Sequence, residues 1–130
     1  MIHIGKNTSS TIISKSIARS GGNASYRGKV DIRASAINSK SIVKCDSLIL
    51  DKDSKSDAYP TNSCKTPLSS LEHEATVSRI NEDNLFYLMS RGLTEEKATE
   101  LIILGFIERF REELPMEYAV ELNPLLRRKL

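Results

Sequence analysis

The sequence predicts a mixed fold in which strands come first, helices follow, and the boundary lies near residue 80. Residues 1–80 contain most of the serines and many β-branched residues, whereas residues 81–130 are rich in Leu, Glu and Arg. Such a shift in composition is typical of two subdomains with different secondary structure. The length of 130 residues suits one ordinary domain that buries its core without disulfides.

Alternating apolar residues predict strands over residues 11–18, 26–32 and 41–50. The third has apolar residues on both faces, which indicates burial on both sides. A fourth strand is predicted over residues 71–80. Strands without intervening helices fit either a sandwich fragment or the coils of a β-solenoid, and their irregular spacing leaves both architectures open.

Residues 51–70 are polar and are predicted to form a long loop. Pro60 and Pro67 lie within it, and at most a short strand is expected around Ala58-Tyr59. Cys64 falls in this predicted loop.

Three helices are predicted in the second part. The first begins after Asn81 and is stopped by Gly92, and the second is capped by Thr94. The third begins at Pro115 and is ended or kinked by Pro124. Core packing is the expected role of the apolar stripes, which are Leu85, Leu88 and Met89, then Ala98, Leu101, Ile102, Gly105 and Phe106, then Tyr118, Ala119 and Leu122.

The overall composition excludes several classes of protein. Lys and Arg number 19 against 17 Asp and Glu, a net charge of +2, which disfavours a dedicated nucleic-acid binder, and the basic end at 127–129 is expected to be solvated. The apolar runs are too short to span a membrane. No secretory signal opens the chain, so we expect a cytoplasmic protein in which Cys45 and Cys64 are reduced thiols.

Titratable residues gather in the last predicted strand. Glu72 and Glu74 share one face of that strand and His73 occupies the other, which is typical of a solvated strand edge. Cys45 in the third strand is either an inert buried thiol or a thiolate that holds sulfur or iron. If one coil of a solenoid separates Cys45 from Glu74, their strands are neighbours about 5 Å apart, and we expect their side chains to point to the same surface. Cys45, Glu74 and His73 then form a candidate iron site.

Several motifs occur together in one order, and in that order they resemble the C-terminal part of the SufB/SufD family of iron–sulfur cluster assembly scaffold proteins. The resemblance implies the final coils of a right-handed parallel β-helix over residues 1–80, followed by a three-helix domain over residues 81–130. The motifs are Gly5-Lys6-Asn7-Thr8, Tyr26-Arg27-Gly28, Cys45-Asp46-Ser47-Leu48, Tyr59-Pro60, Leu71-Glu72-His73-Glu74-Ala75-Thr76-Val77-Ser78, Leu85-Phe86-Tyr87-Leu88-Met89-Ser90-Arg91-Gly92, Gly105-Phe106-Ile107 and Glu113-Leu114-Pro115-Met116-Glu117-Tyr118-Ala119-Val120-Glu121.

The resemblance also implies a function. It predicts a scaffold subunit, not an enzyme, that holds sulfur and iron during assembly of a nascent, transient iron–sulfur cluster. The expected location is the cytoplasm, or the plastid stroma if the protein is organellar. Cys45 matches the thiol that is essential for assembly, and Glu74 matches the acidic residue near it, with Glu72 and His73 beside Glu74 as candidate ligands. The implied partners are a SufC-type ATPase, which alone binds ATP and docks on residues 81–126, a SufD-type or second SufB-type subunit against the β-helix, and sulfur-donor proteins. Neither nucleic acid nor membrane is expected as a partner.

The chain departs from the family in lacking the large upstream part and in its ending from Pro124 onward. Two other hypotheses therefore stay open. One is a truncated interaction module that binds the ATPase but no longer assembles clusters. The other is a thiol-dependent enzyme with Cys45 as nucleophile and His73 as base, for which the sequence offers no orienting residue.

Overall fold

The computed structural model describes residues 1–112 and 114–127. Part of the predicted docking segment, Glu113, and most of the predicted basic end lie outside these residues. The chain divides into two compact units, Met1–Arg79 and Ile80–Leu130. The first holds the strands and the second the helices, and each is described by itself.

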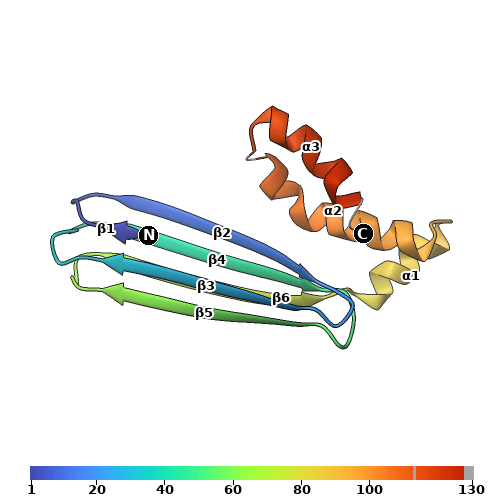
Figure 1. The fold of residues 1–130 in the computed structure, drawn as a ribbon, viewed down its shortest axis with the longest axis horizontal. Coiled ribbons are helices and arrows are strands. Elements are labelled where there is room, and N and C mark those ends of the chain that lie inside the picture. The colour runs from blue at the N-terminus through green and yellow to red at the C-terminus, as the bar shows by residue number, and fades with distance from the viewer. Residues whose placement is uncertain (113, 128–130) are drawn as a thin grey trace. The chain divides into compact units, whose positions relative to one another are not determined.

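The first unit is built from parallel strands in two sheets (Figure 1). One sheet has the order β1-β3-β5 and the other the order β2-β4-β6, so the chain alternates between the sheets as it advances. Strands of one sheet point opposite to strands of the other (Figure 1). This stacking is β-helix-like and rejects the sandwich alternative, whose sheets are antiparallel. The strands are β1 Ile2–His3, β2 Ser9–Ala18, β3 Asn23–Ile32, β4 Lys40–Ile49, β5 Lys55–Cys64 and β6 Ser70–Arg79.

Residues that pair in neighbouring strands of a sheet are separated along the chain by about one coil. Ser9 of β2 pairs with Lys40 of β4, and Lys40 pairs in turn with Ser70 of β6. Corner residues stack in the same way. Asn7 and Asn38 both have left-handed backbones, with φ of 56° and 57°, and the amide of Asn38 donates to Asn7 Oδ1 at 2.8 Å. Asn tolerates this conformation better than most side chains, so the corner repeats without glycine.

The core of the first unit lies between the two sheets. Val30 and Ile32 of β3 are almost fully buried, and they cluster with Val43 and Cys45 of β4. Polar side chains also enter the interior, where a serine hydroxyl of one strand lies beside a serine hydroxyl of the next strand. Ser10 Oγ, for example, lies 2.9 Å from Ser41 Oγ. Buried hydroxyls are tolerated in this position because each finds a hydrogen-bond partner one coil away.

The predicted loop over residues 51–70 is the main error of the sequence prediction for this unit. A ten-residue strand, β5, occupies Lys55–Cys64 and pairs along its length with β3. Pro60 is accommodated because β5 is the edge strand of its sheet. The other four predicted strands are present within two or three residues of their predicted ends, as β2, β3, β4 and β6.

Three helices form the described part of the second unit: α1 Glu82–Ser90, α2 Glu95–Glu112 and α3 Met116–Arg127. The predicted caps are confirmed, since Asn81 Oδ1 accepts from the Asp83 amide at 2.9 Å and Thr94 Oγ1 accepts from the Lys97 amide at 3.4 Å. Gly92, with φ of 93°, follows the end of α1. Pro124 does not end α3, which runs on to Arg127.

The predicted apolar stripes are only partly buried. In α2, Ala98 is buried as expected, but Leu101 is half exposed and Ile103, which lies outside the predicted stripe, is fully buried. In α3, Tyr118 is 66% exposed. The buried face of α2 is thus rotated relative to the predicted one, because that helix is apolar around much of its circumference and burial is decided by its neighbours. No described helix is long and apolar enough to cross a membrane.

Candidate functional site

Cys45 lies on the inner face of β4, between the two sheets. Its side chain is 4% exposed, and its Sγ lies 3.4 Å from Nε2 of His73 on the neighbouring strand β6. The register explains this contact, because Cys45 pairs with Ala75 and His73 stands two residues before Ala75 on the same face. The structure therefore brings together a thiol and an imidazole 28 residues apart in the sequence.

Glu74 lies on the opposite face of β6 from His73. It pairs with Lys44, and its carboxylate is 3.9 Å from Lys44 Nζ. The expectation that Cys45 and Glu74 share one surface is therefore wrong, although their strands are adjacent as predicted. The reason is the alternation of a β-strand: a register shifted by one residue exchanges Glu74 for His73 beside Cys45.

Glu72 and Glu74 do share one face, as predicted from the alternation. Each carboxylate meets a lysine of β4, with Glu72 3.3 Å from Lys40 Nζ and Glu74 3.9 Å from Lys44 Nζ. These side chains are more than half exposed. The lysines neutralise two carboxylates that would otherwise repel each other, and such exposed pairs contribute only about 0–1 kcal/mol.

Tyr26 of β3 closes the opposite wall of the Cys45 site. Its ring centroid is 6.2 Å from that of His73, and it lines the same small cavity as Cys45. The side chain folds over Gly28: a Cβ at that position would come within 2.2 Å of the Tyr26 hydroxyl oxygen. Sequence reasoning did not select Tyr26 as a site residue, although it lies in one of the motifs that carry the family resemblance.

A small cavity of about 20 Å³ adjoins Cys45 between the sheets. Hydroxyl groups line it, and they form a chain in which Ser16 Oγ and Ser56 Oγ each lie 2.7 Å from Ser47 Oγ. A space of this size holds about one water molecule. The thiol thus borders a small interior space that hydroxyl groups line in part.

The thiol of Cys45 is held in its protonated form. Burial raises its pKa, and the carboxylate of Asp46 raises it further, while the hydrogen bond with Tyr26 opposes part of the shift. Burial and the neighbouring Cys45 also raise the pKa of the Tyr26 hydroxyl, which remains a hydrogen-bond donor at neutral pH. A thiol in this state is a weak nucleophile and a weak metal ligand until a cation approaches.

A complete metal site is not assembled within the residues that the structure describes. No group of three or more His, Cys, Asp or Glu side chains among them is arranged to hold a metal ion. Cys45 and His73 supply two donors of types that iron–sulfur clusters accept, but a cluster requires more.

Cys64 is the other cysteine, and it stands apart from this site. It ends β5 and is exposed, and its thiol donates to the carbonyl oxygen of Thr66 at 3.3 Å. Both cysteines are free thiols in this structure.

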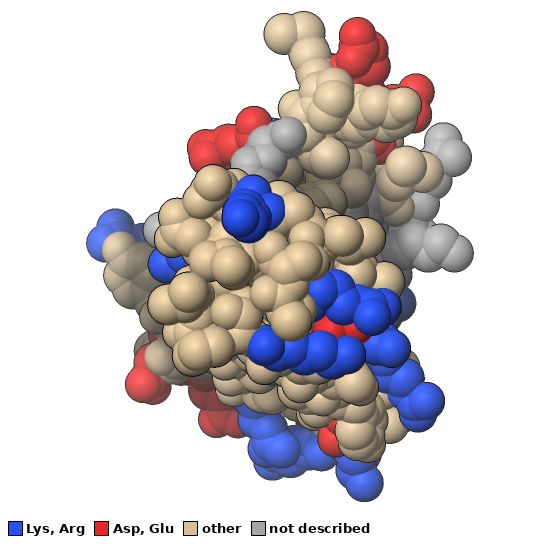
Figure 2. All heavy atoms as spheres, turned by 90° about the vertical axis from the view of Figure 1, so that its left-hand side faces the viewer, with Lys and Arg blue, Asp and Glu red and all other residues tan. Residues whose placement is uncertain are grey.

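Basic side chains gather at the end of the strand stack that faces the viewer in Figure 2. Arg33 and Lys40 are exposed there, but each meets a carboxylate: Arg33 is 3.2 Å from Asp31 and Lys40 is 3.3 Å from Glu72. Ion pairing therefore neutralises part of the positive charge of this end.

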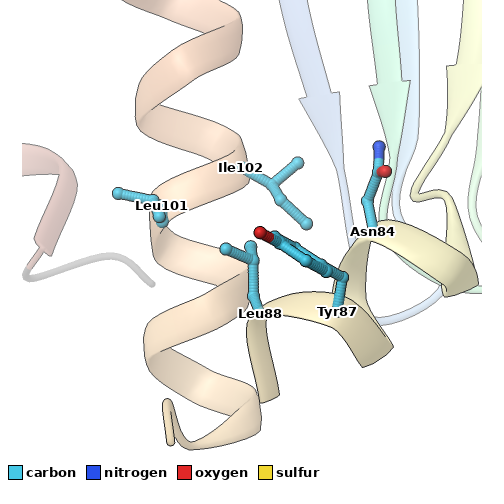
Figure 3. A pocket seen from close by; sticks show the side chains of 5 residues that line it. All are labelled: Asn84, Tyr87, Leu88, Leu101 and Ile102. Atoms are coloured by element: carbon cyan, nitrogen blue, oxygen red, sulfur yellow. The ribbon is translucent and has the colours of Figure 1, made fainter. Parts of the chain in front are cut away.

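The helical unit carries an open groove of about 310 Å³ between α1 and α2 (Figure 3). Tyr87 and Leu88 project from α1 toward Leu101 and Ile102 of α2, with Asn84 at the other side of Tyr87 (Figure 3). The groove is mainly apolar, and Tyr87 and Leu101 are each more than half exposed. An apolar groove of this kind suits a side chain of another protein better than a polar small molecule.

Comparison with known proteins identifies the family. The model of the SUF system FeS cluster assembly SufBD core domain matches residues 1–106. The chain therefore belongs to the SufBD family of iron–sulfur cluster assembly proteins.

Individual relatives agree with this assignment. The chain is 55% identical over 127 residues to the iron–sulfur cluster assembly protein SufB of Bacillus subtilis. It is 56% identical over the same length to an iron–sulfur cluster assembly SufBD family protein of Staphylococcus aureus strain USA300. Each match covers 98% of this chain and 27% of the relative, so the chain spans about a quarter of the length of these proteins.

Proposed function

We propose that the chain acts as the C-terminal part of a SufB-type scaffold, which holds sulfur and iron during assembly of a nascent iron–sulfur cluster and catalyses no reaction by itself. Its strands would form the final coils of a right-handed parallel β-helix, the usual hand of parallel crossovers. The contact between Cys45 Sγ and His73 Nε2, at 3.4 Å, is the observation that carries this proposal. It supports a site where a thiol and an imidazole face one bound group.

Cys45 is the proposed sulfur- and iron-holding residue. Its pKa, raised by burial and by the neighbouring Asp46, keeps it protonated in the isolated chain, so it becomes competent only when a positive charge offsets both effects. Iron itself or a histidine of a partner subunit would supply that charge. Restriction of thiolate formation to the assembled complex would protect the thiol from premature oxidation.

A partner subunit is proposed to complete the ligand set. The described chain offers two ligands, and the strand that carries His73, β6, is an edge strand of its sheet. An unpaired edge can pair with another chain. A SufD-type or second SufB-type subunit at this edge would approach the Cys45–His73 pair from its open side.

Glu72 and Glu74 keep a proposed role as acidic ligands. They stand on the outer face of the same edge strand, and each is held by a lysine in an exposed ion pair. Since exposed pairs are weak, a cation or a partner subunit displaces the lysines at little cost. Glu74 would then serve iron that arrives on the outer face.

Iron and acid-labile sulfide bound by variants tests this function. Each variant is co-expressed with a SufC-type ATPase and a SufD-type subunit and purified without oxygen. Cys45→Ser is expected to lose the cluster, while Cys64→Ser, the matched control at an exposed thiol, retains it. Normal cluster content in Cys45→Ser would reject the proposal.

The helical unit is proposed to dock the SufC-type ATPase through residues 81–126. The apolar groove between α1 and α2 favours this role. A chain that docked the ATPase but assembled no cluster would be the pure interaction module, which is the alternative function. Leu101→Glu in the full chain is expected to reduce ATPase capture at least tenfold. Leu68→Glu, at an exposed leucine of the strand unit, is the control. Equal capture by both variants would reject docking at this groove.

A further inference from the structure

The segments that connect the strands at one end of the strand unit contain basic residues and no Asp or Glu. These segments are residues 4–8, 33–39 and 65–69, and their basic residues are Lys6, Arg33 and Lys65. The segments at the opposite end, residues 19–22 and 50–54, contain two basic and two acidic residues. Positive charge in the connections is therefore concentrated at the end that faces the viewer in Figure 2.

Arg33 and Lys65 occupy the same place in successive coils. Each follows the last residue of a strand, and those last residues, Ile32 of β3 and Cys64 of β5, pair with each other. The backbone continues the pairing, since the Lys65 amide donates to the Ile32 carbonyl oxygen at 2.9 Å. Neighbouring strands lie about 5 Å apart, so these two exposed cationic residues begin side by side. Like charges in such a position repel each other, and an anion bound by both would remove that cost.

A buried carboxylate holds the Arg33 side chain. Asp31, two residues earlier, is 7% exposed, and its Oδ2 lies 3.2 Å from Nε of Arg33. Its other oxygen, Oδ1, is buried and has no hydrogen-bond partner in the part of the chain that the structure describes. A buried carboxylate oxygen without a partner is costly. The ion pair uses Nε, so the two terminal nitrogens of the half-exposed Arg33 side chain can bind a second acceptor.

We propose that Arg33 and Lys65 form an anchor for a carboxylate in an acidic segment of a partner protein, with Asp31 as the positioning residue that orients the Arg33 guanidinium. A guanidinium matches a carboxylate through two parallel hydrogen bonds, and the Lys65 ammonium adds a charge on the next coil. Lys6 adds to the positive field of this end, which raises the rate at which an acidic segment arrives. The anchor does not depend on chemistry at Cys45.

The charge at this end suits an acidic protein segment better than a nucleic acid. Proteins that bind nucleic acid often make about six to ten phosphate contacts, whereas the connecting segments supply only Lys6, Arg33 and Lys65. The carboxylates of Asp31 and Glu72, which are paired with Arg33 and Lys40, would also repel a continuous row of phosphates. An acidic segment, by contrast, needs to place only one carboxylate at the anchor.

The anchor can be tested with the full chain and a synthetic hexaglutamate peptide. The chain is labelled with a nitrogen isotope, and its amide chemical shifts are followed by NMR as the peptide is added, which both measures weak binding and locates it. We expect changes at Arg33 and Lys65 that saturate and that shrink at high salt, with little change at Lys52 at the opposite end. Equal changes at both ends would overturn the anchor. Tighter binding at this end by a single-stranded DNA of equal charge would reject a protein partner.

Two substitutions separate an oriented anchor from general attraction to positive charge. Arg33→Lys keeps the charge but loses the paired hydrogen bonds, and it is expected to weaken peptide binding at least about threefold. Asp31→Asn makes this end more positive but releases the guanidinium, so it is also expected to weaken binding. Lys52→Gln is the matched control at the opposite end and is expected to keep the parent affinity. Parent-like binding by Arg33→Lys, or tighter binding by a folded Asp31→Asn protein, would show that the attraction is not oriented and would overturn the proposal.

Discussion

The two units of the chain differ in what their apolar side chains do. In the strand unit, apolar residues on the inner faces of the strands form a core, and Val30 and Ile32 are almost completely covered by the facing sheet. In the helical unit, α1 buries none of its residues fully, and large side chains such as Phe86 and Met116 remain 74% and 80% exposed. The first unit therefore has a substantial buried core, whereas the second buries few of its apolar residues and exposes many of the large ones.

This difference fits the two tasks proposed for the chain. Chemistry on a thiol needs fixed geometry, which stacked strands provide because each inner side chain is held by neighbours one coil away. Protein docking needs an exposed apolar surface, which the helices provide. Variants that affect one unit and spare the other therefore test the division directly.

The largest expected effect comes from the core of the strand unit. Ile32→Ala removes a fully buried side chain and is expected to lower the free energy of unfolding by about 2–5 kcal/mol. Leu101→Ala, at a half-exposed leucine of the helical unit, is expected to change it by no more than about 0.5 kcal/mol. Urea denaturation measures both, and equal losses would contradict the contrast.

A pair of glycines, one in each unit, gives the next largest effect. Gly28→Ala places a Cβ against the Tyr26 side chain and is expected to cost about 1–3 kcal/mol by overpacking. Gly105→Ala in α2 meets no atom within 4 Å and is expected to stabilise the helix by about 0.5–1 kcal/mol. Thermal denaturation followed by circular dichroism measures both, and a stabilising Gly28→Ala would show that the phenol moves freely.

Acid should weaken the strand unit through one carboxylate. Burial would raise the pKa of Asp51, but hydrogen bonds from the Ser54 hydroxyl and from the amides of Ser54, Ser20 and Asp53 outweigh it and lower the pKa. The resulting stability is present above the unfolded value of about 3.9 and is lost as the pH falls through the lower folded value.

Asp51→Ala is therefore expected to be less stable than the parent at neutral pH, with the difference shrinking below about pH 4. Denaturation midpoints across this pH range provide the measurement. Asp53→Asn is the control, because its backbone amide still donates to Asp51. A difference that stays constant with pH would assign the effect to packing instead of charge.

The smallest expected effect is on the exposed ion pair of Glu74. Glu74→Gln is expected to change the free energy of unfolding by less than about 1 kcal/mol, and by still less at high salt. If Glu74→Gln lowers the iron content of the assembled complex while stability changes by no more than this, the carboxylate has a role in assembly. A stability loss well above that limit would instead make Glu74 a structural residue.

The local sequence predicted the elements whose signals are local. Caps at Asn81 and Thr94, and the alternation of apolar residues in β2, β3 and β4, depend on neighbours within a few positions. β5 was missed because its residues are mostly polar and its pairing with β3 depends on the register of the whole stack. The exposed face of α2 was misplaced for a similar reason, since other elements decide which side of an apolar helix is covered.

The candidate site shows the same contrast between features that depend on local sequence and features that depend on strand register. The strands that carry Cys45 and Glu74 were predicted to be neighbours, but a register error of one residue was enough to place the wrong side chain beside the sulfur. Tyr26 was not selected because its place at the site depends on Gly28 and on a facing sheet. The family resemblance, which covers nearly the whole chain, was the part of the sequence analysis that the comparisons confirmed.

Sulfur transfer to Cys45 tests the account most directly. The complex of the chain with its partner subunits is incubated with a persulfide donor, and the peptides that carry Cys45 and Cys64 are examined by mass spectrometry. We predict that the Cys45 peptide gains one sulfur atom in the complex but not in the isolated chain, and that the Cys64 peptide gains none in the complex. A complex in which Cys64 is modified and Cys45 is not would contradict the account.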